Sequence, residues 1–148
     1  MIIPHWALLA FSASILWGLG YAISGKLMHS GLTPAFLIAC SSILTLPFYI
    51  FILLKSGALQ SNLDFLSEHK GYIALLALQA GAVITGVFLI YGAIQQKNAT
   101  YASIIEISYP MFVCFFSWLL FRDIQINWNI ALGALLIFCG SALVLIKS

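Results

Sequence analysis

Residues Tyr72–Ile94 read YIALLALQAGAVITGVFLIYGAI and contain no charged side chain. Crossing a hydrocarbon core of roughly 30 Å takes about 20 apolar residues as an α-helix, which satisfies its backbone hydrogen bonds within the segment. This run is long enough to cross. Its unbroken apolar character argues against a transmembrane β-strand, in which apolar and polar side chains alternate over about ten residues. The stretch therefore predicts a membrane-spanning helix.

Four further stretches of the 148-residue chain share this character. They predict spans at approximately Trp6–Ser24, Pro34–Leu54, Thr100–Phe121 and Trp128–Ile146. The whole chain is 63% hydrophobic and 7% charged, with a mean hydropathy of +1.09. A soluble domain carries about a quarter charged residues. We predict an all-α membrane protein in which residues 1–148 form a single five-helix transmembrane domain.

The connections between the predicted spans are short, except the one from Lys55 to Gly71. Thr33 is placed to cap a helix that begins at Pro34, because a threonine hydroxyl can accept from the first free backbone N–H groups. In the long connection, Ser61 and Asp64 form a pattern that starts helices. This connection is expected to be either a short interfacial helix or an irregular loop.

The cationic side chains of the loops are divided evenly between the two sides of the membrane. Five spans place the two ends of the chain on opposite faces, so the loops can be sorted by side. One side holds Lys55, Lys70 and Arg122, and the other holds Lys26, Lys97 and Lys147. This balance leaves two interpretations. Another feature fixes one orientation, or the chain inserts both ways and pairs with an inverted copy.

Glu106 is the one carboxylate inside a predicted span. A charge at such depth costs a few kcal/mol or more unless it faces the bundle interior, water or a partner, and intramembrane carboxylates often bind cations or carry protons. There are two structural alternatives. Glu106 is protonated and hydrogen-bonds another helix, or the helix lies shallow enough in the membrane for Glu106 to reach the headgroups. Helical spacing places Ser103, Tyr109 and Pro110 on the same helix face as Glu106. Pro110 has no N–H and should leave the carbonyl of Glu106 without its helical donor.

A second polar stripe runs along the first span, at intervals of three and four residues: Ser14, Trp17, Tyr21 and Ser24. Such a stripe can line a cavity, or it can hold helices together, because serine and other small residues promote close helix contact. For the serines both interpretations stay open. For Trp17 and Tyr21 we favour a cavity.

The third and fifth spans add weaker candidates. Gln79 and Tyr91 of the third span are candidates for a cavity lining, among glycines whose default role is close packing. In the fifth span, Gly133 and Gly140 are seven residues apart and therefore share one helix face. That face has no ionisable residue, so it predicts helix association and a dimer.

Other classes of function lack a sequence signal. Cys40, Cys114 and Cys139 lie within apolar spans without CxxC spacing, which indicates neither a disulfide framework nor a zinc site. No nucleophile elbow, HExxH or phosphate-binding glycine loop occurs. The net charge of +2 is spread thinly, which argues against nucleic-acid binding. We expect no enzyme activity, cofactor or metal.

The chain resembles the drug/metabolite transporter superfamily, specifically a single EamA-type repeat. Three stretches carry the resemblance: Leu16–Lys26, with its Trp-Gly pair and terminal lysine; Tyr91–Pro110, a hairpin into a proline-bearing helix; and Gly133–Gly140, similar to the dimer-forming helix of the small multidrug resistance proteins. Two features depart from the pattern. The first span has no carboxylate, and Arg122-Asp123 stands where many relatives have a glutamate.

The resemblance implies a function and a partner. Family members typically have ten spans, formed by two inverted five-helix repeats around a midplane cavity, so a single repeat implies an inverted second copy or another half-transporter. It implies a small-molecule transporter of the cell membrane, in a bacterium the inner membrane, and an exporter by preference. The alternatives are a flippase for lipids or lipid-linked sugars and, in another class, a membrane subunit that stabilises a partner.

Overall fold

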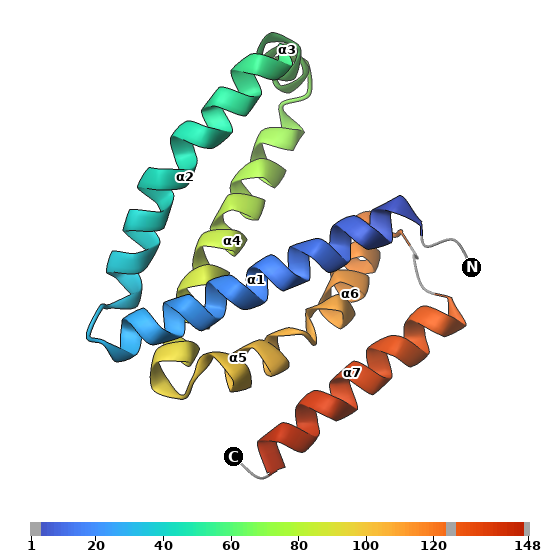
Figure 1. Cartoon of the computed structure of the whole chain (residues 1–148). Coiled ribbons are helices and arrows are strands. Elements are labelled where there is room, and N and C mark those ends of the chain that lie inside the picture. Colours follow the sequence, from blue (N-terminus) through green and yellow to red (C-terminus); the bar gives the residue numbers. More distant parts are fainter. Residues whose placement is uncertain (1–3, 124–126, 147–148) are drawn as a thin grey trace. The chain divides into compact units, whose positions relative to one another are not determined.

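The computed structural model describes residues 4–123 and 127–146, and these residues form helices without any strand. Figure 1 shows the helices, which are α1 (His5–His29), α2 (Pro34–Ser56), α3 (Leu59–Glu68), α4 (Gly71–Gln96), α5 (Ala99–Glu106), α6 (Tyr109–Phe121) and α7 (Trp128–Ile146). Five segments are long and apolar enough to cross a membrane: α1, α2, α4, α7, and α5 with α6 together. The prediction of an all-α, five-span membrane protein is confirmed.

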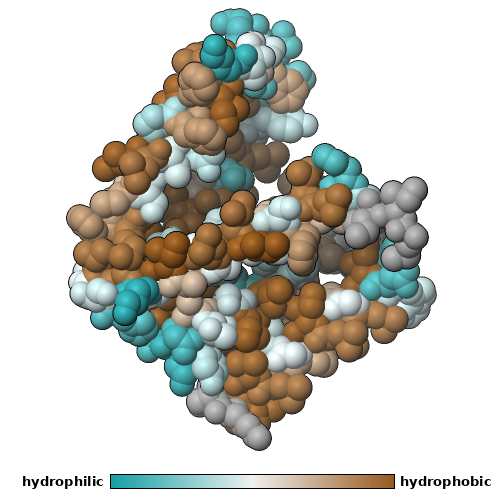
Figure 2. Space-filling model, in the orientation of Figure 1, coloured by the Kyte–Doolittle hydropathy of each residue, from teal (hydrophilic) through white to brown (hydrophobic). Residues whose placement is uncertain are grey.

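The surface of the helices is the surface expected in lipid. Ile43 and Leu44 of α2 are 71% and 77% exposed, and most other large apolar side chains in the described part of the chain are exposed as well. Figure 2 shows apolar residues along the lengths of the helices and hydrophilic residues gathered at their ends and over α3. A water-soluble monomer rarely exposes large contiguous apolar patches. The bilayer is therefore the medium that covers these side chains.

The chain divides into two compact units, which are described here one at a time. The first unit combines α1 up to Lys26 with the chain from Ala93 onward. The second unit extends from Leu27 to Gly92 and contains α2, α3 and most of α4.

In the second unit, local sequence signals set the ends of α2. The backbone N–H of Phe36 donates to Thr33 Oγ1 at 3.4 Å, and Pro34 occupies the start of the helix, as predicted. Gly57 ends α2 in the left-handed region at φ 66°. This conformation costs glycine little because it has no Cβ.

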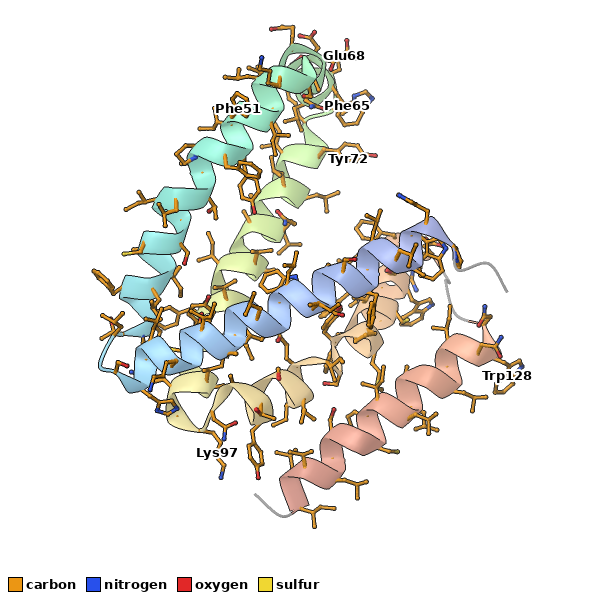
Figure 3. The ribbon with its side chains drawn as sticks, in the orientation of Figure 1. Phe51, Phe65, Glu68, Tyr72, Lys97 and Trp128 are labelled. Carbon is orange, nitrogen blue, oxygen red and sulfur yellow. The ribbon has the colours of Figure 1, made fainter. Side chains whose placement is uncertain are left out.

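The long connection of the second unit contains the short helix α3. It begins at Leu59, two residues before the predicted start, and the Ser61 hydroxyl donates to the carbonyl of Ala58 at 3.1 Å instead of capping the helix. At its end, the Phe65 ring stacks on His69 with centroids 4.6 Å apart and lies 5.2 Å from Tyr72. Figure 3 shows Phe65 and Tyr72 where α3 leads into α4.

In the first unit, α5 and α7 lie side by side (Figure 1). The buried hydroxyl of Ser141 on α7 lies 2.8 Å from the carbonyl oxygen of Ile104 on α5 and 3.0 Å from that of Ile137 in its own helix. A hydroxyl has one proton to donate. The shorter of the two contacts joins the helices.

Replacing Ser141 by alanine is expected to lower the free energy of unfolding by about 0.5–1.5 kcal/mol, the range for one interhelical hydrogen bond in a membrane protein. Thermal unfolding in detergent measures the change. Ser14→Ala is the matched control, because the exposed Ser14 hydroxyl donates only to Phe11 of its own helix, at 2.7 Å. Equal losses in both variants would show that the contact to Ile104 contributes nothing.

Candidate substrate site

Glu106 is the last residue of α5 and lies opposite α1. The Tyr21 hydroxyl donates a hydrogen bond of 2.8 Å to Glu106 Oε1, between residues 85 positions apart in the chain. Tyr21 is buried at 9% exposure, and Glu106 is half-buried. The structure therefore brings together the lone carboxylate of the spans and the tyrosine of the first-span stripe, two residues singled out independently from the sequence.

The fourth span is interrupted at Glu106. It was expected as one helix, but α5 ends at Glu106 and α6 begins at Tyr109. The N–H of Ser108 donates to Ile105 and that of Met111 to Ser108, which are tight-turn bonds instead of α-helical ones. Pro110 lies in the first turn of α6 and has no N–H to give to the carbonyl of Glu106. The interruption is the structural result of this proline.

The interruption places electron-rich groups beside the carboxylate. The carbonyl oxygens at the end of α5 point along the helix axis, and the C-terminal end of a helix carries a partial negative charge. Broken membrane helices in transporters use such ends to coordinate cations. The carbonyls of Ser103, Ile104 and Ile105 already accept hydrogen bonds. The binding of a cation or a proton at Glu106 stays a prediction.

A close approach between α1 and the α4–α5 turn holds Tyr21 in place. A Cβ added to the buried Gly25 would lie 3.3 Å from the Cβ of Ala99 and 3.6 Å from Cγ2 of Ile94, whose side chain is fully buried. Gly25 lies one turn beyond Tyr21 on α1. The missing side chain therefore lets α1 come near enough to α5 for the Tyr21–Glu106 hydrogen bond.

Replacing Gly25 by leucine is expected to push α1 away from the α4–α5 turn and to destabilise the protein by about 1–3 kcal/mol, the usual cost of overpacking. Gly25→Ala should cost much less, because a methyl group needs shifts of only a few tenths of an ångström. Gly18→Leu on the same helix is the control, since a Cβ there meets no atom within 4 Å. Thermal unfolding that ranks Gly18→Leu with Gly25→Leu would contradict the close approach.

A family comparison can now be added to this geometry. A family model described as the EamA-like transporter family matches residues 4–146. The chain belongs to this family. No curated protein and no solved structure matches the chain. The EamA-like family consists of drug and metabolite transporters, so the chain is a multi-pass membrane protein of a transporter family and not of an enzyme family.

The other first-span residues of this EamA-like chain separate into two groups. The Trp17 ring lies 5.8 Å from the Tyr21 ring at an interplanar angle of 50°, and Trp17 is 60% exposed. Ser24 is buried, whereas Ser14 is exposed and bonded within its own helix. Trp17 therefore adds an aromatic ring next to Tyr21, and the face of an aromatic ring can attract a cation.

Ser103 and Tyr109 were placed with Glu106 by helical spacing. The half-buried Ser103 donates its hydroxyl to the carbonyl of Thr100 at 3.1 Å. Tyr109 belongs to α6, beyond the interruption, and is 59% exposed. Ser103 keeps its helical spacing to Glu106 within α5, whereas the spacing of Tyr109 to Glu106 is interrupted by the break. The roles of both residues stay predictions.

Gln79 and Tyr91 belong to the second unit, and their roles in a cavity also stay predictions. Gln79 is exposed on α4, and Tyr91 is half-buried near its end. In residues 4–123 and 127–146, no three His, Cys, Asp or Glu side chains gather where they could bind a metal ion.

The proposed dimer face on α7 is open in the EamA-like chain. A Cβ added at Gly133 or Gly140 would meet no atom within 4 Å. Their interpretation as a dimer face stays a prediction. Sequence reasoning missed Gly25 and Ser141 as structural contacts. A lone serine in an apolar span is a usable signal, because its hydroxyl needs an acceptor in lipid.

Proposed function

We propose that this chain is one half of a secondary transporter, in which two five-helix domains move small cationic metabolites or drugs by alternating access. The observation that supports the proposal is the hydrogen bond between Tyr21 and Glu106 at the broken fourth span. Export is the proposed direction, and the cell membrane, the inner membrane in a bacterium, is the proposed location.

Glu106 is the proposed binding group for either a substrate cation or a proton. The two compete for one carboxylate, which is how exchange of one for the other is coupled. In the described state the Tyr21 hydroxyl occupies one oxygen of this carboxylate. An amine that enters the site donates to Glu106 in place of the Tyr21 hydroxyl or together with it. The Trp17 ring lies next to Tyr21 and can contact the same amine.

The hydrogen bond alone also fits the structural alternative, a carboxyl group that merely ties two helices together. Three features favour a ligand site. Glu106 is only half-buried, the Trp17 ring lies 5.8 Å from the Tyr21 ring, and Pro110 withholds a donor from the Glu106 carbonyl. A contact that served only to join helices would need none of them.

Pairing completes the proposed transporter. The even distribution of lysine and arginine between the two sides gives neither orientation an advantage, and the glycine face of α7 is open to a neighbour. We propose an antiparallel homodimer as the simplest assembly, with a separately encoded half-transporter as the alternative.

A thermal-shift screen of the purified full chain tests the substrate class. The panel contains quaternary amines, polyamines, amino acids and nucleosides. We expect stabilisation by amines and none by nucleosides of no net charge. Stabilisation restricted to neutral or anionic compounds would contradict a carboxylate-based site.

A further inference from the structure

A groove in the first unit lies between α5 and α7, apart from the Tyr21–Glu106 pair. Its volume is about 330 Å³, and it is lined by Thr100, Tyr101 and Ile104 of α5 and by Leu143 and Val144 of α7. We call it the α5–α7 groove. The volume falls at the lower end of the range of roughly 300–1,000 Å³ that is usual for ligand pockets.

The groove has an apolar wall and a polar mouth. Ile104, Leu143 and Val144 present only aliphatic side chains. Thr100 and Tyr101 carry hydroxyl groups and lie in the first turn of α5, next to the polar turn that joins α4 to α5. A turn between two membrane spans lies at the level of the lipid headgroups. The groove therefore extends from headgroup level toward the hydrocarbon, as an amphiphile does.

A positive charge lies at this mouth. The Lys97 ammonium lies 5.1 Å from the centroid of the Tyr101 ring, and Tyr101 itself lines the groove. Figure 3 shows Lys97 projecting from the turn between α4 and α5. The ring holds the exposed lysine beside the groove. Lysines near the membrane surface attract anionic lipid headgroups.

We propose that the α5–α7 groove binds one anionic phospholipid, with an acyl chain along Ile104, Leu143 and Val144 and the phosphate at Lys97 and Thr100. The bound lipid fills the gap between two helices that Ser141 already joins through Ile104. It is a resident lipid at the membrane-facing side of the unit, and its binding does not require the transport proposed above.

Photo-crosslinking tests this site in the intact protein. The full chain is placed in nanodiscs of phosphatidylcholine that contain a small fraction of phosphatidylglycerol with a diazirine in its acyl chain. We expect crosslinks on peptides of α5 and α7 that unlabelled phosphatidylglycerol displaces and extra phosphatidylcholine does not. Lys97→Gln should lower their yield about fivefold, the loss expected for one lysine–headgroup attraction.

Lys55→Gln is the matched control, because the Lys55 ammonium also lies over an aromatic ring, that of Phe51 at 5.8 Å, but on α2. It should leave the crosslinks on α5 and α7 unchanged, and Lys97→Arg should retain them because the charge is kept. Val144→Trp, which fills the groove, should remove them.

Three results would overturn the proposal. The first is an unchanged yield in Lys97→Gln, and the second is equal displacement by both lipids. The third is the absence of lipid crosslinks on α5 and α7 together with crosslinks between copies through the groove, which would make a second chain the occupant.

Discussion

Glu106→Gln is expected to weaken the binding of a cationic substrate about ten- to hundredfold. The glutamine side chain has nearly the same size and can still accept the hydrogen bond from Tyr21, but it has no charge to offer an amine. Losing a hydrogen bond to a charged group costs about 1.5–3 kcal/mol, which corresponds to this range in affinity. Binding to the purified protein, with the best amine from the thermal-shift screen as ligand, measures the change.

Two control variants distinguish an effect of the Glu106 charge on binding from an effect of the substitution on folding. Glu68→Gln makes the same substitution at an exposed carboxylate at the end of α3 and should leave binding unchanged. Tyr21→Phe removes the 2.8 Å hydrogen bond but keeps the ring and the charge of Glu106. It should therefore weaken binding less than Glu106→Gln. If Glu106→Gln lowers thermal stability but leaves affinity intact, Glu106 is a helix-joining group and not a binding group.

Gly133→Leu, alone and with Gly140→Leu, is expected to raise the dissociation constant of the dimer at least about tenfold. Small residues let helix backbones approach in lipid, where packing drives association. A leucine on that face keeps the partner away, and overpacking of this kind costs about 1–3 kcal/mol. Among the described residues, a Cβ at either position would meet no atom within 4 Å beyond its chain neighbours and its own helix backbone, so folding of the monomer should be spared. Crosslinking and mass measurement at graded detergent dilutions report the dimer fraction.

Leu135→Trp is the control for this experiment, because it adds bulk to a different face of the same helix, at a residue that is 54% exposed. It should leave the dimer fraction unchanged. An unaltered dimer in the double glycine variant would place the interface elsewhere, and a dimer lost in all variants alike would point to general damage to α7.

Hydropathy was sufficient to predict the membrane-spanning architecture, because lipid leaves a backbone few alternatives to a helix of about 20 apolar residues. The beginning of α2 was also predictable, since Thr33 and Pro34 act on the backbone within one turn. Pro110 also acts within one turn, because it has no N–H to donate to the carbonyl four residues earlier, and it therefore indicated a carbonyl at Glu106 without its helical donor. It did not indicate the extent of the break, which depends on how the tight turn at Ile107 and Ser108 replaces the lost bonds.

Contacts between helices were harder to predict. The spacing of Trp17 and Tyr21 identified a stripe on α1, and Glu106 stood out by its charge, but nothing in either segment says which helix faces which. The close approach of Gly25 to Ala99, which lies in a distant part of the chain, determines that α1 faces α5. Gln79 was selected by polarity alone, and polarity does not fix the rotation of a helix about its axis.

Counterflow in proteoliposomes tests the central claim most directly. Vesicles with wild-type protein are loaded with the amine identified by the screen and given the same amine, radiolabelled, outside. We predict accumulation of label by the wild type, none above protein-free vesicles by Glu106→Gln, and normal accumulation by Glu68→Gln. Undiminished counterflow in Glu106→Gln would contradict the claim that substrate crosses the membrane by binding at this carboxylate.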